Sequence, residues 1–225
     1  MRALPQRANP RGRSAQKFPC PNKRCCHEAY ACSRRGRRHS ECDWILLGAI
    51  RVIVFDANSG TYKRHWGAYG RKPTDEKLPP YNPAAAPSQQ FGNPVHCVKI
   101  AKDGLVYICD RSNDRIQVFR KDGTFVKEFI IEKNTLGPGS VWDLDFWIDP
   151  KQTFLVNADG TNNEVRTLRR ETGETVGAFG RNGRNAGEFH WVHNLAVDSK
   201  GNIYTTEVDT GKRAQKFRYV SPAVR

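Results

Sequence analysis

The chain has 225 residues, 38% of them hydrophobic, which is enough for one domain with a sizeable core, and no apolar run is long enough to predict a membrane span or a signal peptide. The formal net charge of +14 is concentrated near the start, because residues 1–50 hold eleven Lys and Arg against three acidic residues and leave 26 basic and 20 acidic for the other 175. This small excess of basic residues argues against nucleic acid as a partner of the main body. The composition does not predict a cellular compartment.

The first segment, residues 1–46, has neither helical nor strand periodicity and contains five of the seven cysteines. Its high charge and low apolar content predict an irregular or disordered stretch. Two origins fit this texture: a basic arm, or a displaced start whose sequence is unrelated to the native protein. The run "CPNKRCCHEAYAC" has ligand-type side chains but matches no common zinc spacing, so we expect no metal site there.

The second segment, residues 47–225, is built from short strand-like runs. Runs such as "RVIVFDA", "HCVKIA", "LVYICD" and "RIQVFR" alternate with turns that contain Asp-Gly or Lys-Gly. Alternating apolar residues between such turns are typical of an all-β meander.

Three stretches of this segment resemble one another: residues 94–129, 140–179 and 191–217. Each opens with a valine, continues with an apolar pair and closes its second strand with Asp or Glu. Repeats of this length with four short strands are the signature of β-propeller blades. Since residues 51–69 fit the outer two strands of a preceding blade, the predicted fold class is an all-β partial propeller of about three and a half blades.

The best unit, "GLVYICDRSNDRIQVFRKDGTFVKEF", resembles the NHL-repeat family, and the resemblance covers residues 51–220. In the motif, four or five residues separate the acidic end of the second strand from an arginine, and the middle repeat departs from it with Glu164 at the arginine position. The resemblance implies a six-bladed ring. An open array would leave apolar blade faces uncovered, so we expect either a protein partner that closes it or a fragment of a longer chain.

Histidines recur at one position of the repeats. The residue after the opening valine is His96 in the first, Trp142 in the second and His193 in the third. Alternate blades of a six-bladed ring lie about a third of a turn apart with their inner strands starting at the channel, so His96 and His193 are expected to converge. Three imidazoles around an open position form a catalytic zinc site, and two are present here. The same pattern also fits ordinary polar residues at the channel rim.

The stretch "NPVHCVKIAKDGLVYICDRSNDRIQVF" resembles a second family, the propeller lyases that cleave a peptidyl-α-hydroxyglycine into a peptide amide and glyoxylate. The resemblance implies zinc ligands at His96 and His193, a catalytic Arg111, and a peptide-like or small-molecule substrate in the channel. Zinc would then hold the substrate hydroxyl and lower its pKa, a base would remove its proton, and Arg111 would neutralise the carboxylate.

The family pattern also has a third zinc histidine, two blades before His96, and a tyrosine just ahead of Arg51. This sequence has no blade at the first place and Leu-Gly-Ala-Ile, residues 47–50, at the second. We therefore expect the chain to be incomplete and inactive by itself. The alternative function is a non-catalytic NHL module that binds protein or RNA partners.

The two cysteines of the repeats, Cys97 and Cys109, fall at strand positions that two blade layers would bury. Free thiols are the usual state of buried cysteines, so we expect both to be free.

Overall fold

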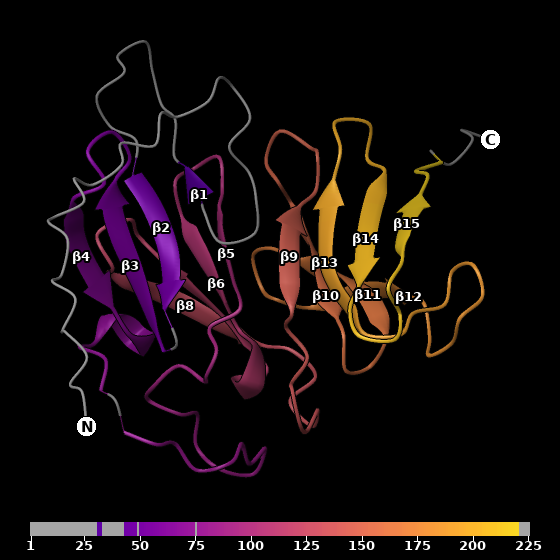
Figure 1. Cartoon of the computed structure of the whole chain (residues 1–225). Helices are drawn as coiled ribbons and strands as arrows, with labels where there is room; N and C mark the ends of the chain where they lie inside the picture. Colours follow the sequence, from indigo (N-terminus) through magenta and orange to yellow (C-terminus); the bar gives the residue numbers. More distant parts are fainter. Residues whose placement is uncertain (1–30, 33–42, 49, 75, 221–225) are drawn as a thin grey trace, which may run out of the picture.

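The computed structural model describes residues 31–32, 43–48, 50–74 and 76–220, with the backbone alone for those before residue 50. Most of the predicted irregular segment, including nearly all of the Cys-rich run, lies outside these residues. Within them the regular structure is β apart from two short 3-10 turns, η1 (Ala68–Gly70) and η2 (Arg111–Asn113) (Figure 1). No helix in the described ranges is long and apolar enough to cross a membrane.

The strands form four antiparallel sheets, in the orders β1-β2-β3-β4, β5-β6-β7-β8, β9-β10-β11-β12 and β13-β14-β15. Their bounds are β1 Ala31–Cys32, β2 Asp43–Gly48, β3 Arg51–Asp56, β4 Tyr62–Trp66, β5 Cys97–Ile100, β6 Val106–Asp110, β7 Arg115–Phe119, β8 Phe125–Ile130, β9 Asp143–Phe146, β10 Phe154–Asp159, β11 Glu164–Arg169, β12 Thr175–Phe179, β13 Val192–Val197, β14 Ile203–Glu207 and β15 Ala214–Phe217.

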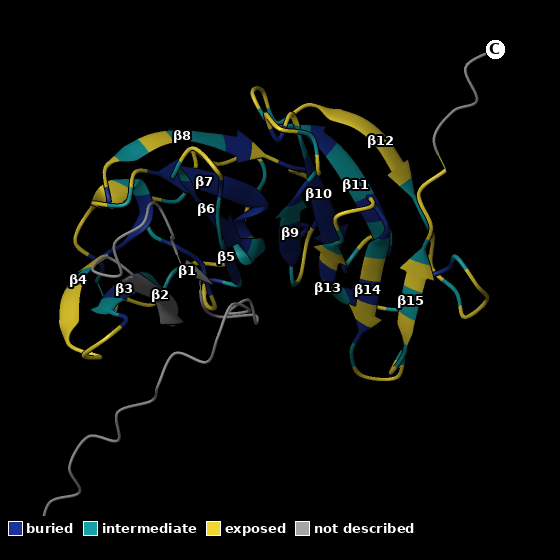
Figure 2. Cartoon of the chain, turned by 90° about the horizontal axis from the view of Figure 1, so that it is seen from above, coloured by how far each residue is buried: buried dark blue, intermediate teal, exposed yellow. Residues whose placement is uncertain are grey.

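Seen from above, the sheets fan around a common centre, with β1, β5, β9 and β13 innermost (Figure 2). Consecutive strands arranged in this way are the blades of a β-propeller. The predicted fold class, an all-β partial propeller, is therefore confirmed.

The strands are distributed differently from the expected three and a half blades. The first sheet has four strands, and β2 spans the predicted boundary between residues 46 and 47, pairing with β3 from Asp43↔Asp56 to Gly48↔Arg51. The last sheet has three strands in the described part of the chain. In the sequence, the short apolar run after residue 43 is a weak strand signal. In the structure it is part of a six-residue strand because it pairs with β3.

Apolar side chains fill the three junctions between neighbouring blades. Both faces of β6 and β7 are buried, since blade 2 has a neighbour on each side. On the outward face of blade 4, in contrast, alternate residues of β14 and β15 are exposed, among them Tyr204, Thr206, Ala214 and Lys216. This face thus presents aromatic, small and polar side chains to the outside.

One ion pair recurs in three blades and joins the second strand to the third. Nε of Arg115 lies 2.6 Å from Asp110, Nε of Arg166 lies 3.1 Å from Asp159, and Nε of Arg213 lies 2.7 Å from Glu207. The middle blade therefore keeps the arginine that appeared to be replaced by Glu164. Glu164 is opposite Asp159 in the ladder. Arg166, two residues later, lies on the same face of the strand, and its guanidinium contacts the Asp159 carboxylate.

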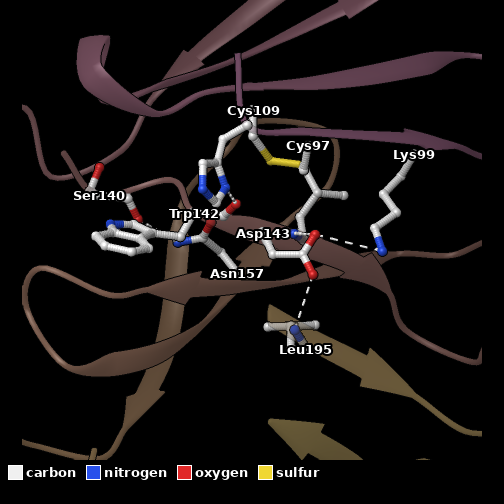
Figure 3. The surroundings of a disulfide bond; sticks show 10 residues. Cys97, Lys99, Cys109, Ser140, Trp142, Asp143, Asn157 and Leu195 are labelled. Atoms are coloured by element: carbon white, nitrogen blue, oxygen red, sulfur yellow. Dashed lines mark hydrogen bonds and ion pairs between the residues drawn. A yellow bond between two sulfur atoms is a disulfide. The ribbon is translucent and has the colours of Figure 1, made fainter. Parts of the chain in front are cut away.

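The prediction of free thiols at Cys97 and Cys109 was wrong, because the two form a disulfide (Figure 3). Their predicted burial is confirmed, at 3% and 0% exposure. The cysteines face each other directly in the β5–β6 ladder with their Cα atoms 4.7 Å apart, within the range that a disulfide bridges. The sequence placed each cysteine on its strand but did not supply this register.

Candidate active site at the channel rim

The starts of three inner strands bring His96, Trp142 and His193 together. The ring centroids of His96 and His193 are 4.6 Å apart, although the residues belong to blades 2 and 4. Trp142, from the intervening blade, packs edge-to-face on both, at 5.7 Å from His96 and 5.3 Å from His193. The expected convergence of the two histidines is thus present in the structure.

Two aspartates of β9 hold β13 close enough for this contact. Oδ2 of Asp143 accepts a hydrogen bond of 3.0 Å from the Leu195 N–H, and Oδ2 of Asp145 accepts one of 2.8 Å from the Val197 N–H. Asp143 is buried and also lies 3.6 Å from Nζ of Lys99 (Figure 3). The sequence signal was an Asp-x-Asp alternation on an inner strand, which fits exposed edge residues equally well.

Hydrogen bonds set the tautomer of both histidines. Nδ1 of His96 contacts the Trp142 carbonyl oxygen, and Nδ1 of His193 contacts Oδ1 of Asn194. Both partners are acceptors, so each Nδ1 carries a proton, and in the neutral form of the ring Nε2 then has the lone pair. Zinc-binding histidines are commonly oriented in this way by an oxygen acceptor on the other ring nitrogen.

A zinc site needs three or four ligands, and this pair would supply two of them. In the described ranges, no group of three or more His, Cys, Asp or Glu side chains is placed to hold a metal ion. Burial, together with the positive charge of Arg111 and the proximity of His193, lowers the pKa of His96 to about 4, although the hydrogen bond to the Trp142 carbonyl acts in the opposite direction. His96 is therefore neutral at pH 7, the form that coordinates a metal.

Arg111, the first residue of η2, completes the cluster. Its Cζ lies 4.5 Å from the centroid of the Trp142 ring. Its Nε is buried without a hydrogen-bond partner, and no carboxylate of the described residues is at ion-pair distance from this guanidinium. Burial lowers the pKa of Arg111, but a guanidinium stays protonated at any ordinary pH. A partly desolvated cation without a counter-ion can bind an anion from outside the chain.

A cavity of about 770 Å³ is lined by sequence neighbours of these residues, although the rim side chains themselves do not line it. It is lined by Asn93, three residues before His96, and by Ser112, which follows Arg111. Ile50, at the position where the lyase resemblance implies a tyrosine, also lines it. One tyrosine does reach the cavity from the long β4–β5 connection: the Tyr81 hydroxyl donates a 2.7 Å hydrogen bond to the Lys133 carbonyl.

The fold and this rim define the class of the molecule: a partial β-propeller that carries, near its centre, two facing histidines and an arginine without an acidic partner among the residues that the structure describes. No protein-family model matches the chain.

Among solved structures, the chain is similar to a streptogramin B lyase, with 12% identity and a TM-score of 0.51 over 87% of this chain and 55% of that one. It is also similar to a catalytically inactive virginiamycin B lyase from Staphylococcus aureus with quinupristin, with 14% identity and a TM-score of 0.49 over 87% and 57%. Hydrazine synthase from Kuenenia stuttgartiensis matches with 11% identity and a TM-score of 0.48 over 77% and 42%. The chain thus spans about half the length of the structures that it matches, and the likeness shows the propeller fold alone.

Proposed function

We propose that this chain is part of a zinc-dependent propeller lyase that acts on a peptidyl-α-hydroxyglycine. The observation that carries the proposal is Arg111, a half-buried cation without a carboxylate partner in the described part of the chain, beside the imidazoles of His96 and His193. The reacting residue of this substrate carries a carboxylate next to a hydroxyl group. Arg111 would bind that carboxylate, and the proposal takes His96 and His193 as ligands of the metal.

Each side chain has a separate task in this proposal. The face of Trp142 holds the guanidinium plane of Arg111, so the carboxylate is received in a defined orientation. The hydrogen bonds at Nδ1 keep both Nε2 atoms available as ligands. Zinc, when bound, acts as a Lewis acid that lowers the pKa of a hydroxyl group. A third ligand and the proton-accepting base would come from outside the described residues, so we expect this chain to bind substrate and metal better than it turns substrate over.

The disulfide agrees with a protein that is exported. Disulfides persist in oxidising compartments and are rare in the cytosol. A buried bridge between Cys97 and Cys109 therefore favours an extracytoplasmic location.

Zinc titration of the metal-free chain tests the ligands. We expect His96→Ala and His193→Ala each to weaken zinc binding at least about tenfold, as loss of a ligand or its support does. His65→Ala, an exposed histidine of blade 1, is the control and should bind as the unmodified chain does. An unmodified chain that takes up no zinc, but binds RNA or a protein partner in a salt-dependent way, would instead support the non-catalytic NHL module.

A second titration tests Arg111 with N-acetyl-α-hydroxyglycine and its methyl ester as probes. We expect the acid to bind and the ester, which has no carboxylate, to bind at least about tenfold more weakly, because charge-assisted hydrogen bonds to a guanidinium are strong. Arg111→Gln should remove the difference between the two probes. Equal binding of acid and ester by the unmodified chain would contradict the role given to this arginine.

A further inference from the structure

The disulfide lies between the two strand ends that carry the rim site. Cys97 is the first residue of β5 and directly follows His96, while Cys109 is two residues before Arg111 on β6. The His96 N–H donates a 2.9 Å hydrogen bond to the Cys109 carbonyl, so this bond and the bridge tie the consecutive residues His96 and Cys97 to the same residue of β6. We propose that the disulfide is a positioning element of the site, which fixes the separation of His96 and Arg111.

The local structure gives the bridge this task. β5 has four residues, and His96 lies just before it, at the point where a short strand frays most easily. Arg111 lies in a 3-10 turn rather than in the ladder. Without the bridge, the two side chains would depend on strand-end hydrogen bonds for their separation.

The neighbouring blade depends on this separation as well. His96 bonds to the carbonyl of Trp142 and Arg111 stacks on the ring of the same residue, so both must reach Trp142 together. A binding site loses affinity for its ligand when a side chain that contacts the ligand moves by about half an ångström to one ångström.

Packing alone does not require the bridge. Both cysteines belong to the apolar cluster between blades 2 and 3, together with Tyr107, Val141 and Leu144. Small apolar side chains would fill nearly the same volume. A variant without the bridge is therefore expected to keep the blade junction and to lose the fixed geometry of the rim.

The test compares Cys97→Ala/Cys109→Ala with Leu168→Ala, which removes a fully buried side chain of β11 from the same cluster. The inference rests on the proposed function, so binding of N-acetyl-α-hydroxyglycine is one measurement. We expect binding to weaken about ten- to a hundredfold in the bridge variant and to stay within about twofold in Leu168→Ala. Cys97→Ala/Cys109→Val, which fills more of the space, serves if the first variant does not fold.

A ligand-free measurement separates this inference from the proposed function. Hydrogen exchange of the Arg111 Nε–H and the NMR signal of the Trp142 indole N–H report the rim geometry directly. We expect faster Arg111 exchange and a shifted Trp142 signal in the bridge variant, with neither change in Leu168→Ala. If the unmodified chain binds no probe, the proposed function fails while this measurement still decides the role of the bridge. Unchanged signals in the bridge variant, or the same changes in Leu168→Ala, would overturn the inference.

Discussion

Arg111, which begins η2, and Arg115, which follows it, lie in different regions and have different surroundings. Arg115, at the junction of blades 1 and 2, is 1% exposed and bonds to five partners: Asp110, Tyr69, Ser88, Gln90 and Glu128. Arg111, at the rim of blades 2 to 4, stacks on Trp142 and has no acidic partner in the described residues. A cation whose donors are satisfied within the chain stabilises the fold, whereas one left without a counter-ion is available to a ligand.

The largest effect is expected at the blade 1–2 junction. Arg115→Met should lower the free energy of unfolding by about 3–5 kcal/mol, because it leaves the Asp110 carboxylate buried without its charge partner. Arg169→Met, which breaks an exposed ion pair with Glu174, is the control and should change stability by less than about 0.5 kcal/mol. Urea denaturation measures both. Similar losses in the two variants would remove the distinction between the junction and the surface.

A glycine behind the rim should give the next largest effect. Gly139 has a φ of +87°, and a Cβ there would collide with the carbonyl oxygen of Arg111. We expect Gly139→Ala to cost about 2–3 kcal/mol and to displace η2, since both strain and overlap must be relieved. Gly137→Ala is a matched control, with a φ of +70° and open space around the Cβ, and should cost about 1 kcal/mol. Thermal unfolding distinguishes overlap from backbone strain.

Asp114 should give a smaller effect of opposite sign. Burial raises its pKa to about 7 from an ordinary value of 3.8, and its Oδ2 has no hydrogen-bond partner. The folded state therefore holds a proton that the unfolded state has released, so the free energy of unfolding falls as the pH rises from about 4 to about 7. Asp114→Asn should flatten this fall and stabilise the chain at pH 8 by about 1 kcal/mol.

Asp122→Asn is the control of opposite sign for the pH series. A hydrogen bond from the Thr124 N–H lowers the pKa of Asp122, so this carboxylate stabilises the fold above its ordinary pKa and the contribution is lost as the pH falls. Its replacement should destabilise the chain slightly at neutral pH. A gain in both variants at pH 8 would point to a general charge effect instead of the burial of Asp114.

The smallest change in stability is expected at Arg111 itself. Arg111→Gln loses the stacking on Trp142 but relieves the desolvation of an unpaired charge, so the free energy of unfolding should change by less than about 1 kcal/mol. The pKa of His96 should rise, since the charge of Arg111 lowers it in the unmodified chain. NMR titration of the metal-free protein measures that rise. A loss as large as that of Arg115→Met would mean that Arg111 is a structural residue.

Much of the fold was readable because blades repeat. Period-2 apolar runs and glycine turns marked the strands, and aligning the repeats placed His96, Trp142 and His193 at one level of the ring. The first strands of blade 1 were less clear, because a short apolar run becomes a strand through pairing with a neighbour. The roles of His96, His193 and Arg111 remain predictions, although the three now lie within one cluster.

The all-β repeats and the residues that begin the inner strands could be predicted without coordinates, because both follow from periodicity along the chain. The folded structure was needed to show that Cys97 faces Cys109, that Arg166 bonds to Asp159, and that Arg115 has partners for its charge while Arg111 has none in the described part. These facts depend on strand register and on contacts between blades, where a shift of one residue changes the partner and the face of every side chain.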